Sequence, residues 1–279
     1  MTTIRSPAVA GLFYPADTQQ LAQDVRQLLA RAKCYDLKPK ALIVPHAGYI
    51  YSGAIAATAY ASLQSIAEKI KRIVLLGPAH RVAVEGLALP GADMFETPLG
   101  RVQLDADLVR KIAHLPQVTI NKAAHTLEHS LEVQLPFLQS VLNDFTLLPL
   151  AVGHASAQVV AEVLEQVWGG DETLIVISSD LSHYLPYAIA QRVDHATVQS
   201  ILRLQQPIGH DHACGGTPIS GLIIAAQKHH LTPHLLDLRN SGDTAGSRDQ
   251  VVGYAALAFT EEERSEEHTS ELQSRLPIS

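Results

Sequence analysis

The fold is decided by residues 40–53, KALIVPHAGYIYSG. The apolar run at residues 41–44 predicts a short buried strand, and the proline that follows it predicts that the strand ends just before His46. Tyr49 and Tyr51 come next, between two glycines, and good helix formers follow them. In open α/β sheets ligands bind beyond the carboxyl ends of the strands. This strand, turn and helix therefore place polar side chains where chemistry is expected.

Two later segments repeat the arrangement. The strand predicted at residues 73–76, in RIVLLGPAHR, leads to His80, and the strand predicted at residues 174–177, in TLIVISSDLSHY, leads to Asp180 and His183. Strand and helix patterns alternate along the rest of the chain, and its last two strand patterns resemble a hairpin. This order predicts an α/β fold, a three-layer α/β/α sandwich around a mainly parallel but mixed sheet.

Length and composition indicate one large domain. The chain has 279 residues, of which 47% are hydrophobic, and we expect a single domain over residues 1–260. The formal net charge is −7, but residues 261–279, with six Glu and two Arg, supply −4 of it. That tail has no packing periodicity and resembles a translated sequencing adapter, so we expect it to be non-native and disordered. The nearly neutral remainder, without a basic cluster, argues against nucleic-acid binding.

The sequence favours a cytoplasmic protein. Its amino terminus has no apolar core of the kind that a signal peptide needs, and no segment has the roughly 18 uninterrupted apolar residues of a membrane span. No membrane association is expected. The two cysteines, Cys34 and Cys214, do not form a disulfide framework, so free thiols are expected.

Three histidines differ from the other eleven because each follows a separate apolar strand: His46, His80 and His183. Neutral imidazole is the commonest metal ligand, and a metal site needs three or more donors that converge from different segments. The carboxyl edge of a parallel sheet provides that convergence. The remaining donor could be Asp180 or the thiolate of Cys214, which lies in a glycine turn before a helix.

A further group of polar residues lies in residues 123–142, AAHTLEHSLEVQLPFLQSVL, which predict a helix that is kinked or divided at its proline. His129 and Glu132 would share one face of this helix and could line the crevice or orient metal ligands from behind. Residues 125–129 also fit the inverted zinc-protease pattern HxxEH, a weak signal on its own. The candidates for contact with a bound ligand are Tyr49, Tyr51 and Glu132.

Five motifs in a fixed order, PHAGYIYSG, LLGPAH, EHSLEVQLPFLQ, SSDLSHY and ACGGTPI, resemble the Memo family, named in bacteria AmmeMemoRadiSam system protein B. The resemblance covers nearly the whole chain. It implies a fold shared with LigB-type class III extradiol dioxygenases, in which non-haem iron(II) opens catechol rings. It also implies that His46, His80 and Cys214 bind a metal, and that Asp180 and His183 border the same pocket.

Two functions follow as hypotheses. The first is a metal-dependent redox or oxygenase-like enzyme that holds iron(II), with His183 and Asp180 as an acid–base pair. Because a thiolate is a soft donor, copper or zinc would also suit the site. The family's system name implies a radical SAM partner. The second is a non-catalytic module that binds a small molecule or a peptide in the same pocket.

Overall fold

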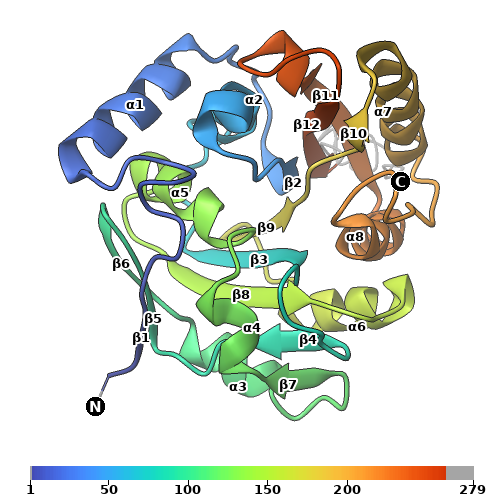
Figure 1. Cartoon of the computed structure of the whole chain (residues 1–279). Helices are drawn as coiled ribbons and strands as arrows, with labels where there is room; N and C mark the ends of the chain where they lie inside the picture. Colours follow the sequence, from blue (N-terminus) through green and yellow to red (C-terminus); the bar gives the residue numbers. More distant parts are fainter. Residues whose placement is uncertain (1, 262–279) are drawn as a thin grey trace, which may run out of the picture.

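The computed structural model describes residues 2–261 (Figure 1). Its helices are α1 (Thr18–Arg31), α2 (Tyr49–Ala61), α3 (Ala106–Ile112), α4 (Lys122–Thr126), α5 (Leu135–Val141), α6 (Ala157–Val167), α7 (Tyr187–Leu202) and α8 (Gly216–Lys228), with the short 3-10 helices η1 (Glu132–Gln134) and η2 (Ser241–Asp243). Its strands are β1 (Ile4–Arg5), β2 (Pro39–Val44), β3 (Arg72–Pro78), β4 (Leu87–Leu89), β5 (Met94–Thr97), β6 (Gly100–Gln103), β7 (Val118–Ile120), β8 (Thr146–Val152), β9 (Thr173–Ser178), β10 (His183–Leu185), β11 (Leu231–Asn240) and β12 (Val251–Glu261).

A mixed nine-stranded sheet forms the middle of the molecule. Its order is β10-β12-β2-β9-β3-β8-β4-β7, with β11 paired to β12. Strands β2, β9, β3 and β8 run parallel to their neighbours within this group, whereas β12 is antiparallel to β2 and to β11, and β4 is antiparallel to β8. A small second sheet has the order β1-β5-β6. The prediction of a mixed sheet is confirmed, and its central group of strands, β2, β9, β3 and β8, is parallel.

Helices cover both faces of the sheet, so the molecule has three layers. Side chains alternate along a strand, and in β2 Leu42 and Val44 pack into one core while Ala41 and Ile43 pack into the other. The first core includes residues of α1, α2 and α5, and the second includes residues of α3, α6, α7 and α8. Figure 1 shows α1, α2 and α5 on one side of the sheet and α6 and α8 on the other. The predicted sandwich is confirmed.

The central strands bring three site segments to one edge. In β2 and β9 Val44 pairs with Ser178, and in β3 and β9 Leu76 pairs with Ile177. Because the three strands are parallel and in adjacent positions, their carboxyl ends lie side by side. The residues that follow these ends are therefore neighbours although they are far apart in the sequence.

Two local predictions were wrong. Residues 123–142 do not form one helix: α4 ends at Thr126, a loop follows, and the chain resumes as η1 and then α5, which carries the proline in its first turn. The helix after β2 begins at Tyr49, directly after the N-cap Gly48, rather than after the two tyrosines. Both tyrosines of the PHAGYIYSG motif therefore belong to the first turn of α2.

Within residues 2–261 no helix combines the length and the apolar character that crossing a bilayer requires. The predicted non-native tail lies, except for Glu261, outside the described residues.

Candidate metal centre

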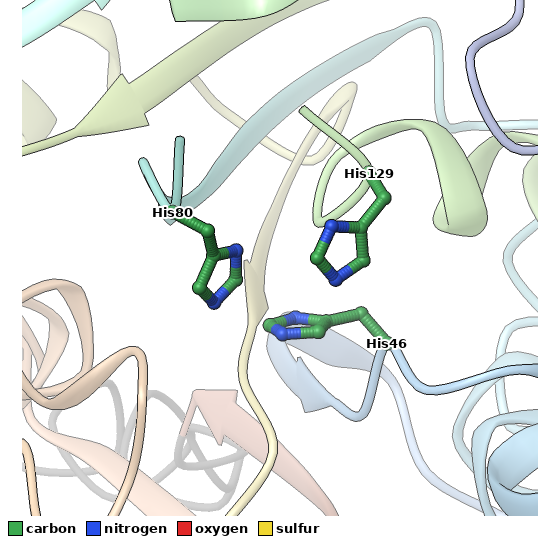
Figure 2. Close-up of side chains that lie close together, drawn as sticks. All are labelled: His46, His80 and His129. Atoms are coloured by element: carbon green, nitrogen blue, oxygen red, sulfur yellow. The ribbon is translucent and has the colours of Figure 1, made fainter. Parts of the chain in front are cut away.

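Three imidazole rings meet beyond the carboxyl edge of the sheet. His46 follows β2, His80 follows β3, and His129 lies in the loop between α4 and η1. One ring nitrogen from each lies within 4.8 Å of the other two (Figure 2). The ring centroids are 5.3 Å apart for His46 and His80, 5.4 Å for His46 and His129, and 4.8 Å for His80 and His129. Three donors from three segments can converge on one ion.

His46 is held firmly and kept neutral. Its backbone N–H donates to Oδ1 of Asp180 at 2.7 Å, and its Nδ1 lies 2.9 Å from Oγ of Ser178. The side chain is buried, and burial, followed by the nearby His129 and His80, lowers the pKa of His46 well below its usual value. The ring is therefore uncharged at neutral pH, which is the form that binds a metal.

Glu128 orients two of the three rings. Its carboxylate accepts the backbone N–H of His80 at 2.6 Å and those of His129 and Ser130 at 2.9 Å. Nδ1 of His80 lies 2.9 Å from Oε1 of Glu128. Burial would raise the pKa of Glu128, but the hydrogen bonds from His80 and from the backbone outweigh it and lower the pKa to about 2. The carboxylate is ionised, so His80 carries its proton on Nδ1 and leaves Nε2 free.

His129 completes the cluster from the loop. Its ring packs against Phe13 at a centroid distance of 4.8 Å, and its Nδ1 lies 3.4 Å from Oε1 of Glu128. Among the described residues, this Nδ1 is one of the few buried polar side-chain atoms without a hydrogen-bond partner. Burial lowers the pKa of His129 to about 4. A second neutral imidazole thus faces His46 and His80.

Cys214 lies beside His46 but outside the three-histidine cluster. Its Sγ is 3.3 Å from Nε2 of His46 and accepts the backbone N–H of Asp180 at 3.3 Å. In the described part of the chain, the donor atoms that all lie within 4.8 Å of one another belong to the three histidines. Burial, followed by the charge of Asp180, raises the pKa of the thiol to about 12, so without a metal Cys214 is protonated.

Asp180 and His183 border the same region. Asp180 is buried, and burial raises the pKa of its carboxyl to about 6 although the His46 backbone N–H opposes that shift. Nδ1 of His183 lies 2.9 Å from the carbonyl oxygen of Leu181, which can only accept, so His183 is protonated on Nδ1. The next residue, Tyr184, has a φ of 56° and is 69% exposed. Its left-handed backbone is unusual for a residue other than glycine.

Comparison with known proteins places this architecture in a family. The sequence model of the family described as "Memo-like protein" matches residues 5–258. The chain belongs to the Memo family. A "MEMO1 family protein" of Aquifex aeolicus is 38% identical over 268 residues, covering 92% of this chain and 99% of that protein. A "MEMO1 family protein" of Metallosphaera sedula is 34% identical over 286 residues, with the same coverage.

The solved structures add a likeness in fold. The crystal structure of the uncharacterized protein JW3007 from Escherichia coli K12 aligns with a TM-score of 0.50 at 15% sequence identity, covering 77% of this chain and 98% of that one. At this identity the match shows a shared fold and nothing about activity.

Within the Memo-family site, two predicted ligand contacts are corrected. Glu132 is fully buried, and its carboxylate accepts from the side chains of Arg5 and Tyr14 and from the backbone N–H groups of residues 8 and 9. The hydroxyl of Tyr49 donates to the carbonyl of Val133 at 2.7 Å. Both side chains have a structural role, because their polar atoms form hydrogen bonds within the protein. The third candidate, Tyr51, is 39% exposed.

The sequence also missed the position of His129 in the cluster. It predicted that His129 and Glu132 share a helix face and either line the crevice or orient the ligands from behind, but the loop turns the two side chains to different partners. The weak protease pattern is not assembled: His125 is buried, and its Nε2 bonds to the carbonyl of Ala88 at 2.7 Å. The sequence feature that could have pointed to His129 is the glutamate directly before it, because the carboxylate of that glutamate reaches the backbone of His80.

Proposed function

We propose that this Memo-family protein binds one divalent metal ion through His46 and His80, with a third ligand from Cys214 or His129, and works as a redox or oxygenase-like enzyme. The observation that supports the proposal is the convergence of three imidazole nitrogens, from three separate segments, within 4.8 Å. Buried polar atoms are normally hydrogen-bonded, and Nδ1 of His129 has no such partner among the described residues.

The donor set suits a transition metal. The lowered pKa values of His46 and His129 mean that protons do not compete for these nitrogens at neutral pH. We favour iron(II), and a thiolate from Cys214 would also suit copper or zinc. When bound, such an ion would supply a Lewis acid with positions open to a substrate and, for iron, to oxygen.

We propose that two residues, His183 and Asp180, move protons beside the metal ion. His183 holds its own proton on Nδ1, so its Nε2 is free to take one from a substrate. Asp180, whose pKa is about 6, can hold or release a proton near neutral pH. Tyr51 and Tyr184 expose aromatic surface, and the ring of Tyr184 lies 5.9 Å from that of His183. We propose a small organic molecule as the substrate and a radical SAM enzyme as the partner.

Elemental analysis of protein purified without oxygen tests the proposal. The unmodified protein should contain one metal ion per chain, and His46→Ala or His80→Ala should lose it while still unfolding cooperatively. The exposed His114→Ala is the matched control and should keep the metal. Unchanged metal content in the two site variants would refute the ligand assignment. Iron that reacts with oxygen supports the enzyme, whereas a metal-free protein that binds a small molecule or a peptide supports a binding module.

A further inference from the structure

A buried chain of hydrogen bonds lies behind His46 and involves residues that the sequence analysis did not single out. It runs from Tyr60 through Gln134 and Ser178 to the imidazole. Tyr60, Gln134 and Ser178 are fully buried, and His46 is 2% exposed. Because water does not reach these groups, each donor and acceptor must find its partner within the protein.

The orientation of Gln134 is fixed by its neighbours. Its side-chain nitrogen lies 3.0 Å from the carbonyl oxygen of Pro45, which can only accept, so the amide nitrogen faces that way. Its oxygen accepts the hydroxyl of Tyr60 at 2.8 Å. The second hydrogen of the same nitrogen points to Oγ of Ser178 at 2.7 Å. Gln134 therefore donates to Ser178.

Ser178 has one proton, and that proton is already used. Its Oγ lies 2.6 Å from the carbonyl oxygen of Ser130, which can only accept, so the serine hydroxyl donates there. With Gln134 donating to one lone pair, the remaining lone pair of Oγ faces Nδ1 of His46 at 2.9 Å. Only a hydrogen on Nδ1 completes this arrangement.

We infer that Gln134 and Ser178 are positioning residues that hold His46 in the tautomer with its proton on Nδ1, so that the lone pair of Nε2 faces the candidate metal centre. The consequence for metal binding rests on the proposed function, but the tautomer itself does not. Nε2 is the atom that faces the thiol of Cys214 at 3.3 Å. Groups that hydrogen-bond the far nitrogen of a metal-binding histidine fix its orientation and raise its basicity.

Nitrogen-15 NMR of the metal-free protein, labelled at histidine, tests the tautomer directly. Long-range nitrogen–proton correlations at pH 7.5 should show a protonated Nδ1 and an unprotonated Nε2 for His46. In Ser178→Ala the acceptor is gone, and the population should shift toward the tautomer protonated on Nε2. A matched control is Ser220→Ala, which removes another buried hydroxyl that accepts a backbone N–H and donates to a carbonyl. The control should leave the His46 signals unchanged.

Zinc titration of the same proteins tests the consequence. Ser178→Ala should weaken Zn²⁺ binding about 10- to 100-fold, and Ser220→Ala should not weaken it. An Nε2-protonated His46 in the unmodified protein overturns the inference, whatever the metal result. The inference is also overturned if Ser178→Ala keeps the tautomer of the parent protein, or if that variant binds zinc with unchanged affinity. Should the unmodified protein bind no metal, the proposed function fails while the NMR result still decides the tautomer.

Discussion

The thiol of Cys214 and the imidazole of His46 face each other, with Sγ 3.3 Å from Nε2. Without a metal, the thiol holds its proton because its pKa is about 12, and the neutral ring accepts from it. A metal at Nε2 would displace this contact, and the thiol would either lose its proton and bind the ion or turn aside. The third ligand therefore controls how binding depends on pH.

The pH dependence of Zn²⁺ affinity should separate the two ligand sets. If Cys214 is a ligand, binding releases its proton, and affinity should rise about tenfold per pH unit between pH 7 and 9. If His129 is the ligand, that slope should be absent, because the pKa of His129 is about 4 and the ring is already neutral. Isothermal titration in buffers of different ionisation enthalpy counts the protons released. Cys214→Ser should abolish the slope in the first case and change nothing in the second.

Asp180→Asn should stabilise the metal-free protein above pH 6. The folded-state pKa of Asp180, about 6, lies above its ordinary value of 3.8, so its contribution to stability is complete below pH 3.8 and is lost as the pH rises through 6. The difference in the free energy of unfolding between variant and parent should grow by about 2.4 kcal/mol from pH 4 to pH 8. Urea unfolding at both pH values measures it.

Asp249→Asn, which removes an exposed carboxylate, is the control for that experiment. A stability gap for Asp180→Asn that does not widen with pH would contradict the raised pKa. If the gap widens as expected, the parent retains a carboxylate that lowers its own stability at neutral pH. Such retention is typical of functional sites.

Glu128→Gln should weaken Zn²⁺ binding about 10- to 100-fold. The carboxylate uses both oxygens, accepting the backbone N–H of His80 on Oε2 and its ring nitrogen on Oε1. A glutamine offers one acceptor oxygen, so one of these N–H groups would face an NH₂ group and the imidazole would lose its fixed orientation. Competition with a chromophoric chelator measures the affinity. Equal affinity for Glu128→Gln and for the exposed control Glu68→Gln would contradict this role.

Arg5→Met should destabilise the protein by about 3–5 kcal/mol. Arg5 pairs with the fully buried carboxylate of Glu132, and the substitution leaves that charge without its counter-ion. Urea unfolding measures the loss, with the exposed Arg31→Met as the control. The double variant Arg5→Met, Glu132→Gln should recover part of the stability, since it removes the uncompensated charge. A loss below about 1 kcal/mol would show that the pair is dispensable.

Much of the architecture could be predicted because it depends on local pattern. The short apolar runs before His46, His80 and Asp180 are strands, and parallel strands in adjacent positions deliver the residues after them to one edge. The hydrophobic pattern of each strand and the residues that end it are enough to predict this arrangement. The proximity of His46 and His80 could therefore be predicted.

The remaining features of the candidate site depend on tertiary contacts that no local sequence pattern encodes. His129 reaches the cluster because Glu128 bonds to the backbone at His80, which is 48 positions away in the sequence. The sequence predicted instead a helix over residues 123–142, kinked or divided at its proline, and that helix misplaced both His129 and Glu132. Tertiary packing likewise decides whether the side chain of a tyrosine or a glutamate faces solvent or bonds to another group of the protein. Tyr49 is an example, since it is buried and donates to a backbone carbonyl.

The carboxylate of Glu132 holds the first strand and the turn after it, although Arg5 precedes it by 127 positions. During translation these early residues leave the ribosome long before their anchor has been made. The contact with Glu132 can form only after the middle of the polypeptide has emerged, so it is among the later contacts to be made. Shortening the protein at that end would therefore remove a contact that forms late, next to the loop that carries His129, rather than an independent folding nucleus.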